Sequence, residues 1–238
     1  MPPRPVRIAL PLLATAACVS AAAAGEIRGR LWASREAARL AAREPAALAA
    51  TGGRAARATH DRRLVRAQRP VAEAVVYIVE IPDKVERRLA SRGRRGRSRP
   101  PMPVMVQVRE AFSPRVVVVP AGDSVGFLNR DRIWHNAFSV SAARRFDTGK
   151  LPPGAGDTVT FQRPGLVTVH CDVHPEETGY VLVVPNRAWT RPDSLGEFRL
   201  PKLPAGRYQL RAWHPHLGEL RRTADVPKRG HGAIELAF

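Results

Sequence analysis

The sequence predicts an all-β protein whose central part is an antiparallel sandwich or barrel. From Val104 to Val184, short runs of β-branched and aromatic residues recur at nearly regular spacing, separated by turns rich in glycine and proline. This pattern is typical of antiparallel sandwiches. Further short apolar runs follow Pro185 and predict a small β-sandwich-like extension over residues 186–238.

The first 24 residues predict an export signal that is removed from the mature chain. Arg4 and Arg7 precede an apolar run from Ile8 to Val19, and small residues then lead to a cleavage site after Ala24. The run is shorter than a helix that crosses a bilayer. We therefore expect a periplasmic protein with no transmembrane segment after removal of the signal.

Residues 25–103 are expected to add strands and a helical insertion before the central sandwich. Residues 26–32 alternate polar and apolar side chains, and residues 74–79 form a β-branched run that predicts a buried strand. The stretch 34–50, rich in alanine and arginine, predicts a weak surface helix. Residues 91–101 carry no apolar side chain, so we expect a solvated basic loop.

The chain is strongly basic. It has 39 lysines and arginines against 21 aspartates and glutamates, a formal net charge of +18. Arginine supplies nearly all of this charge alongside abundant alanine, which favours genome-wide base composition over a selected patch for an anionic partner. The arginine-rich loop lacks the interleaved aromatic residues that stack on bases, so we expect no nucleic-acid partner.

Removal of the signal takes Cys18 away and leaves Cys171 as the single cysteine of the mature chain. Such a thiol cannot form an internal disulfide. In an oxidising compartment it is protected either by a bound metal ion or by burial as an inert apolar side chain. Cys171 alone leaves both interpretations open.

The residues around Cys171 favour a metal site. Strand alternation places Cys171 on the same face as Val167 and Val169, which is the core side. His174 follows three residues later, close enough to share a metal ion with the thiolate. Further ligands must come from elsewhere, and His135, in the loop after an earlier strand, is the candidate.

The order of these motifs resembles the blue-copper cupredoxins, particularly the plastocyanin-like periplasmic ones. The resemblance covers about residues 104–185 and rests on Phe112-Ser113-Pro114, Pro120 to Asp131, His135-Asn136-Ala137-Phe138-Ser139, and Pro164 to His174. Weaker likenesses link the chain to longer exported proteins described as methylamine-utilisation proteins, and residues 186–238 to carboxypeptidase regulatory-like modules. The resemblance implies a Greek-key β-sandwich that binds one mononuclear copper ion. It also implies one-electron exchange with a redox partner protein and no enzymatic activity.

By this resemblance, His135, Cys171 and His174 are three copper ligands, and a thiolate with two imidazoles suits both oxidation states of copper. Asn136 is expected to tie the two ligand loops together. The family normally supplies a methionine as a further, axial ligand, but alignment places Glu177 there. Glu177 is then an axial ligand that favours Cu(II) or zinc, or it faces solvent and leaves an open position, or the site is degenerate.

Three functions stay open at this point. They are an electron carrier, a non-redox module that handles copper or zinc and docks to a periplasmic partner, and a small oxidase or superoxide-reacting centre at an open coordination position. Of the other histidines, His170 is predicted to lie at the surface, and His214 and His216 are predicted to be structural.

Overall fold

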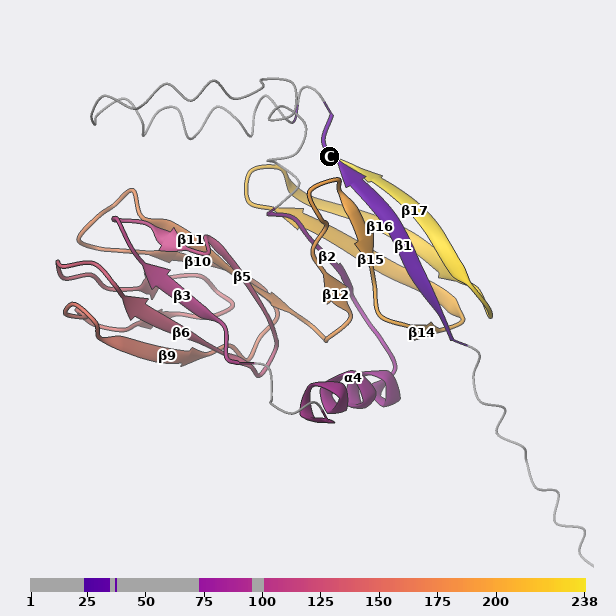
Figure 1. Ribbon diagram of the computed structural model, residues 1–238, viewed down its shortest axis with the longest axis horizontal. Coiled ribbons are helices and arrows are strands. Elements are labelled where there is room, and N and C mark those ends of the chain that lie inside the picture. The colour runs from indigo at the N-terminus through magenta and orange to yellow at the C-terminus, as the bar shows by residue number, and fades with distance from the viewer. Residues whose placement is uncertain (1–23, 35–36, 38–72, 96–100) are drawn as a thin grey trace, which may run out of the picture.

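The computed structural model describes residues 24–34, 37, 73–95 and 101–238, which form two β-sandwiches side by side and one helix, α4 (Asp83–Arg95) (Figure 1). The predicted signal and most of the predicted helical insertion lie outside the described residues and stay predictions. No helix among the described residues is long and apolar enough to cross a membrane.

The first sandwich, called the site sandwich, is built from β3 to β11 and confirms the all-β prediction. The chain passes repeatedly from one of its sheets to the other, as a Greek key requires. One sheet has the order β4 (Phe112–Ser113), β3 (Val104–Gln107), β6 (Ser124–Asn129), β9 (Gly156–Thr160). The other has the order β5 (Val116–Pro120), β11 (Thr178–Val184), β10 (Gly165–His170), β7 (Phe138–Ser139), β8 (Phe146–Asp147). Two pairs, β3 with β6 and β5 with β11, are parallel, so the sheets are mixed rather than wholly antiparallel.

The second sandwich also has two sheets. In one, β1 (Ala24–Trp32) pairs with β13 (Glu197–Arg199), β14 (Leu203–Pro204) and, in parallel, β17 (His231–Ala237). The other sheet has the order β12 (Trp189–Thr190), β2 (Val75–Ile78), β15 (Gly206–His214), β16 (Gly218–Val226).

This pairing differs from the predicted division into successive segments 25–103, 104–185 and 186–238. Strands from residues 186–238 contribute to both sheets of the second sandwich, but β1 lies between β13 and β17, and β2 lies between β12 and β15. In each sheet, a strand from the first part of the chain lies between strands from residues 186–238. Neither sheet is continuous unless strands from both parts of the chain pair with each other. The site sandwich is therefore inserted into the second sandwich, between β2 and β12.

The helix α4 corrects the expectation of a basic loop for residues 91–95, because it continues to Arg95, and residues 96–100 lie outside the described residues. Asp83 and Glu86 in its first turn complement the positive end of the helix dipole. Val85 and Leu89, one turn apart, pack against the core of the second sandwich. Arginine is a good helix former, so the absence of apolar residues after Ala90 does not end the helix.

The two sandwiches share an apolar interface between their facing sheets. On β2, Val76 and Ile78 point into the core of the second sandwich, whereas Val75 and Tyr77 point into the interface. The other interface residues are Val116, Val118, Leu182, Val184 and Trp213. Strands buried on both faces read as uninterrupted apolar runs rather than as alternating patterns, which explains the sequences of β2, β5 and β11.

We predict that Leu182→Ala destabilises the protein by about 2–5 kcal/mol, because the side chain is only 4% exposed in this interface and its loss leaves a cavity. Its direct partner on β10, Leu166, is 39% exposed and provides the matched control, with an expected loss of about 0.5 kcal/mol or less for Leu166→Ala. Urea unfolding measures both. Equal losses would show that the sandwiches do not pack through Leu182.

Candidate metal centre

His135 lies between β6 and β7 and is completely buried. Its backbone is fixed by an isolated bridge to Leu151, in which the His135 amide donates to the Leu151 carbonyl (3.2 Å) and the Leu151 amide donates back (2.6 Å). The imidazole is therefore held at the end of the site sandwich by the backbone of a neighbouring loop.

The other candidate ligands lie in the loop that joins the antiparallel strands β10 and β11. Cys171 directly follows β10 and is 2% exposed, in line with Val167 and Val169, as the alternation predicts. His174 and Glu177 follow within a turn in which the Glu177 amide donates to the His174 carbonyl (2.9 Å). Because β11 begins at Thr178, the loop is short and brings three side chains to one point.

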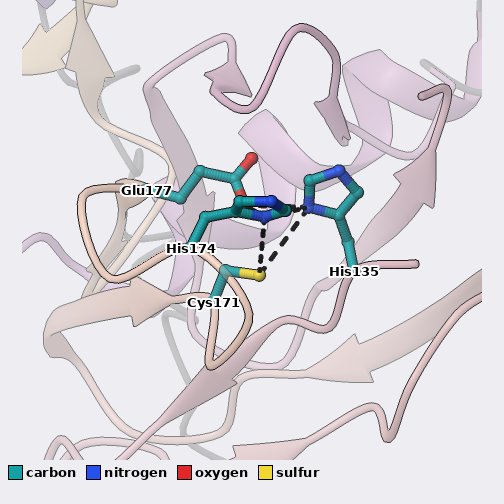
Figure 2. Close-up of side chains that lie close together, drawn as sticks. All are labelled: His135, Cys171, His174 and Glu177. Atoms are coloured by element: carbon teal, nitrogen blue, oxygen red, sulfur yellow. Dashed lines mark hydrogen bonds and ion pairs between the residues drawn. The ribbon is translucent and has the colours of Figure 1, made fainter. Parts of the chain in front are cut away.

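Four potential ligand atoms converge from His135, Cys171, His174 and Glu177, all within 4.8 Å of one another (Figure 2). The sulfur lies 3.7 Å from His135 Nδ1 and 3.9 Å from His174 Nδ1, and the two nitrogens lie 3.2 Å apart. A metal ion about 2.0 Å from nitrogen and about 2.3 Å from sulfur separates such atoms by about 3.3–3.8 Å. The nitrogens and the sulfur thus have the spacing of ligands that share one ion.

The Glu177 carboxylate supports this fit. One of its oxygens, Oε2, lies 3.0 Å from His135 Nδ1 and 3.8 Å from His174 Nδ1. The other, Oε1, is buried without a hydrogen-bond partner among the described residues. A buried carboxylate beside imidazole and thiol groups needs a compensating positive charge, and a metal cation held by these four residues would supply it. Glu177 is 2% exposed, so the alternative in which it faces solvent is wrong.

Asp131 orients the His135 ring. His135 Nε2 lies 3.1 Å from Asp131 Oδ2, and in the tautomer that donates this hydrogen bond the lone pair of Nδ1 faces the other ligands. The amides of Arg109 and Glu110 donate to the same carboxylate (2.6 and 2.9 Å), and both residues have positive φ angles of 56° and 55°. Burial favours protonation of Asp131, but the two amides and the nearby imidazole outweigh it and lower its pKa.

Asn136 joins the two ligand loops, as predicted. Its side-chain oxygen accepts a hydrogen bond from the Asp172 amide (2.8 Å), and its side-chain nitrogen donates to Asp147 (3.2 Å). Burial raises the pKa of the Cys171 thiol, although the backbone amides of Asn136 and His174 act in the opposite direction. The thiol therefore gives up its proton when a cation binds, and metal binding is coupled to proton release.

Two further residues of the site, Gln107 and Asp131, were not predicted from the sequence. Gln107 is completely buried, and its Nε2 donates to Glu177 Oε2 and to the Asn136 carbonyl (3.0 Å each). One signal was present, because Gln107 follows the buried Met105 by two residues and so puts an amide on the core face of β3. For Asp131 the sequence shows only an acidic residue in the ligand loop.

Three other histidines, His170, His214 and His216, are not members of this cluster. His170 is half-buried and packs against Phe138, with ring centroids 5.8 Å apart. His214 is 1% exposed, and burial, with the nearby positive groups, lowers its pKa to about 4. His216 Nε2 lies 2.8 Å from an Arg115 guanidinium nitrogen, a cation that disfavours a second metal ion there. A structural role for His214 and His216 fits these contacts.

No protein-family model matches the chain, and no curated protein matches it. Among solved structures, a copper-containing nitrite reductase from Thermus scotoductus SA-01 is 29% identical with a TM-score of 0.34, over 35% of this chain and 22% of that chain. A reduced mutant form of amicyanin is 24% identical with a TM-score of 0.33, over 34% of this chain and 81% of that chain. A purple cupredoxin from Nitrosopumilus maritimus is 22% identical with a TM-score of 0.31, over 34% of this chain and 98% of that chain.

The chain thus spans about a fifth of the length of the nitrite reductase. TM-scores of this size, over about a third of the present chain, assign neither a family nor a function. The geometry of the four side chains carries the functional argument.

We predict that Asp131→Asn weakens Zn(II) binding by about 10–100-fold, because the ring of His135 loses its charged acceptor. Competition against a chromophoric chelator measures the affinity. Asp172→Asn, an exposed carboxylate beside Cys171, is the matched control and is expected to bind Zn(II) as the wild type does. A similar loss in both variants would mean that general charge, rather than ring orientation, matters.

Proposed function

We propose that this chain is an exported cupredoxin-like protein that binds one copper ion through His135, Cys171, His174 and Glu177 and carries single electrons. The observation that carries the proposal is the convergence of two imidazole nitrogens and one cysteine sulfur, 3.2–3.9 Å apart, in a buried position. Copper bound to this set supplies a Cu(II)/Cu(I) couple. The predicted export signal supports a periplasmic location for the protein.

The surroundings of the four side chains suit an electron carrier. The backbone bridge at His135, its hydrogen bond to Asp131 and the Asn136 contacts hold the ligands in one geometry. Rigid ligands keep the geometry constant while the charge of the site changes, which lowers the cost of electron transfer. The side chain of Glu177 is fully buried, and that of His174 is 15% exposed.

A docking area for a redox partner protein is available beside the ligands. Ile133 and Trp134, which precede His135, are 43% and 54% exposed, and Val173, which precedes His174, is 39% exposed. Exposed apolar side chains of this kind are common in protein interfaces. We propose that the partner covers this area and exchanges electrons through the exposed edge of His174.

The oxidase hypothesis receives less support than the electron carrier. A small-molecule reaction at the metal needs an open coordination position that substrate can reach. Here Glu177 Oε2 lies 3.0 Å from His135 Nδ1, beside the other three ligands, and Cys171 and Glu177 are each 2% exposed. We therefore propose a protein that is not an enzyme.

A second function is favoured by one specific observation, the buried carboxylate. Two imidazoles, a thiolate and a carboxylate are a donor set that also suits Zn(II). A module that stores or delivers copper or zinc would use the same four residues without a change of oxidation state. The two functions differ in whether the copper-loaded protein shows a reversible one-electron potential in voltammetry.

We predict that the copper-loaded protein has an intense visible absorption from thiolate-to-copper charge transfer and a reversible one-electron potential. Cys171→Ser is expected to abolish the absorption, because the thiolate that produces it is gone. Absorption spectroscopy and voltammetry test this. A wild-type protein without the band contradicts the proposal, and tight Zn(II) binding without reversible copper chemistry would favour the metal-handling function.

For Glu177→Met we predict a raised reduction potential and a shifted absorption band, because a soft thioether replaces a hard carboxylate and stabilises Cu(I). The neighbouring Glu176 is exposed, so Glu176→Met serves as the matched control. An unchanged spectrum in Glu177→Met would remove Glu177 from the metal site.

A further inference from the structure

Gln107 is a polar residue buried in the site sandwich. It is the last residue of β3, is completely buried, and follows the equally buried Met105 on the same face. A buried amide is tolerated when hydrogen bonds compensate its loss of water. The partners of Gln107 therefore indicate its role.

The amide nitrogen of Gln107 makes two hydrogen bonds, and both point at the metal centre. Nε2 donates to Glu177 Oε2 (3.0 Å) and to the carbonyl of Asn136 (3.0 Å), the residue after His135. Both partners are acceptors, so the amide nitrogen rather than the amide oxygen must face them. Gln107 thus connects the residue after one ligand to the carboxylate of another.

The contact falls on the carboxylate oxygen that faces the other ligands. Oε2 lies 3.0 Å from His135 Nδ1, and it is also the acceptor for Gln107. Oε1 is buried without a partner among the described residues. The hydrogen bond therefore does two things, since it stops rotation of the carboxylate and draws electron density from the oxygen that faces the metal position.

We propose that Gln107 is a positioning residue that limits Glu177 to a weak, single-oxygen interaction with the metal and so adjusts the preference of the site between Cu(I) and harder cations. The inference rests on the proposed metal centre and specifies how that centre is tuned. Without the amide, the carboxylate rotates freely, binds more strongly, and favours Cu(II) and Zn(II) over Cu(I). With Glu177 held in this way, the soft sulfur of Cys171 is the stronger ligand and the site favours Cu(I).

The test compares Gln107→Leu with the wild type, both as the full chain. Leucine fills a similar volume but donates no hydrogen bond to Glu177. The affinities for Cu(II) and for Zn(II), each relative to the affinity for Cu(I), are therefore expected to rise about tenfold. A tenfold change in the Cu(II)/Cu(I) affinity ratio lowers a one-electron potential by about 59 mV. Gln162→Leu, at an exposed glutamine, is the matched control and is expected to leave both quantities unchanged.

A double variant separates positioning from a general structural effect. In a Glu177→Met background there is no carboxylate to hold, so adding Gln107→Leu is expected to leave the potential and the metal affinities where Glu177→Met alone puts them. If Gln107→Leu does not fold, Gln107→Asn removes the same contact by shortening the side chain and is expected to give the same shift.

The outcomes are distinguishable from failure of the proposed function. A wild-type protein without a thiolate-to-copper band rejects the copper centre itself. A wild-type protein with the band, but with an unchanged potential and Zn(II) affinity in Gln107→Leu and Gln107→Asn, overturns the role of Gln107 alone. A shift that persists in the Glu177→Met background also overturns it, because the effect then does not pass through the carboxylate.

Discussion

The antiparallel pairing of β10 with β11 is the constraint on which the rest of the structure depends. Six residue pairs align these strands, and their short connection carries Cys171, His174 and Glu177. A one-residue slip of the register would turn the sulfur away from the core. The slip is prevented because β11 is buried on both faces, on one side by the core of the site sandwich and on the other by the second sandwich. The position of the ligands is thus secured by packing far from the ligands.

A second constraint is the cost of burying polar groups. The cluster holds a carboxylate, two imidazoles and a thiol in a largely buried region, and each lone pair without a partner there is unfavourable. Asp131 contacts the outer nitrogen of His135, and Gln107 donates to Glu177 Oε2, the oxygen that faces the cluster. The ligand atoms lie close to one another, an arrangement that a bound cation would stabilise.

The sequence predicted the parts of the structure that depend on local pattern. Alternation placed Cys171 on the core face, and motif order brought His135 and His174 to it, because strand period and loop position are local properties. Membership of β1 and β2 in the second sandwich was not predictable in this way, since it depends on pairing between distant segments. The uninterrupted apolar runs of β2, β5 and β11 did contain the information that both faces are covered. Asp131 was missed because a hydrogen bond between loops leaves no periodic signal, and the core-face position of Gln107 did not by itself identify its partners.

The insertion of one sandwich within the other has a consequence for the order in which the protein is assembled. β1 and β2 are synthesised first, but the edge of β1 that pairs in parallel with β17 has no partner until β17, the last described strand, has been synthesised. The site sandwich is continuous in sequence and can close while the flanking strands are still without partners. Such contacts between distant segments form slowly. A chain of this design stays incompletely folded until its last residues have emerged, the state that a polypeptide needs if it is to be threaded through a narrow translocation channel.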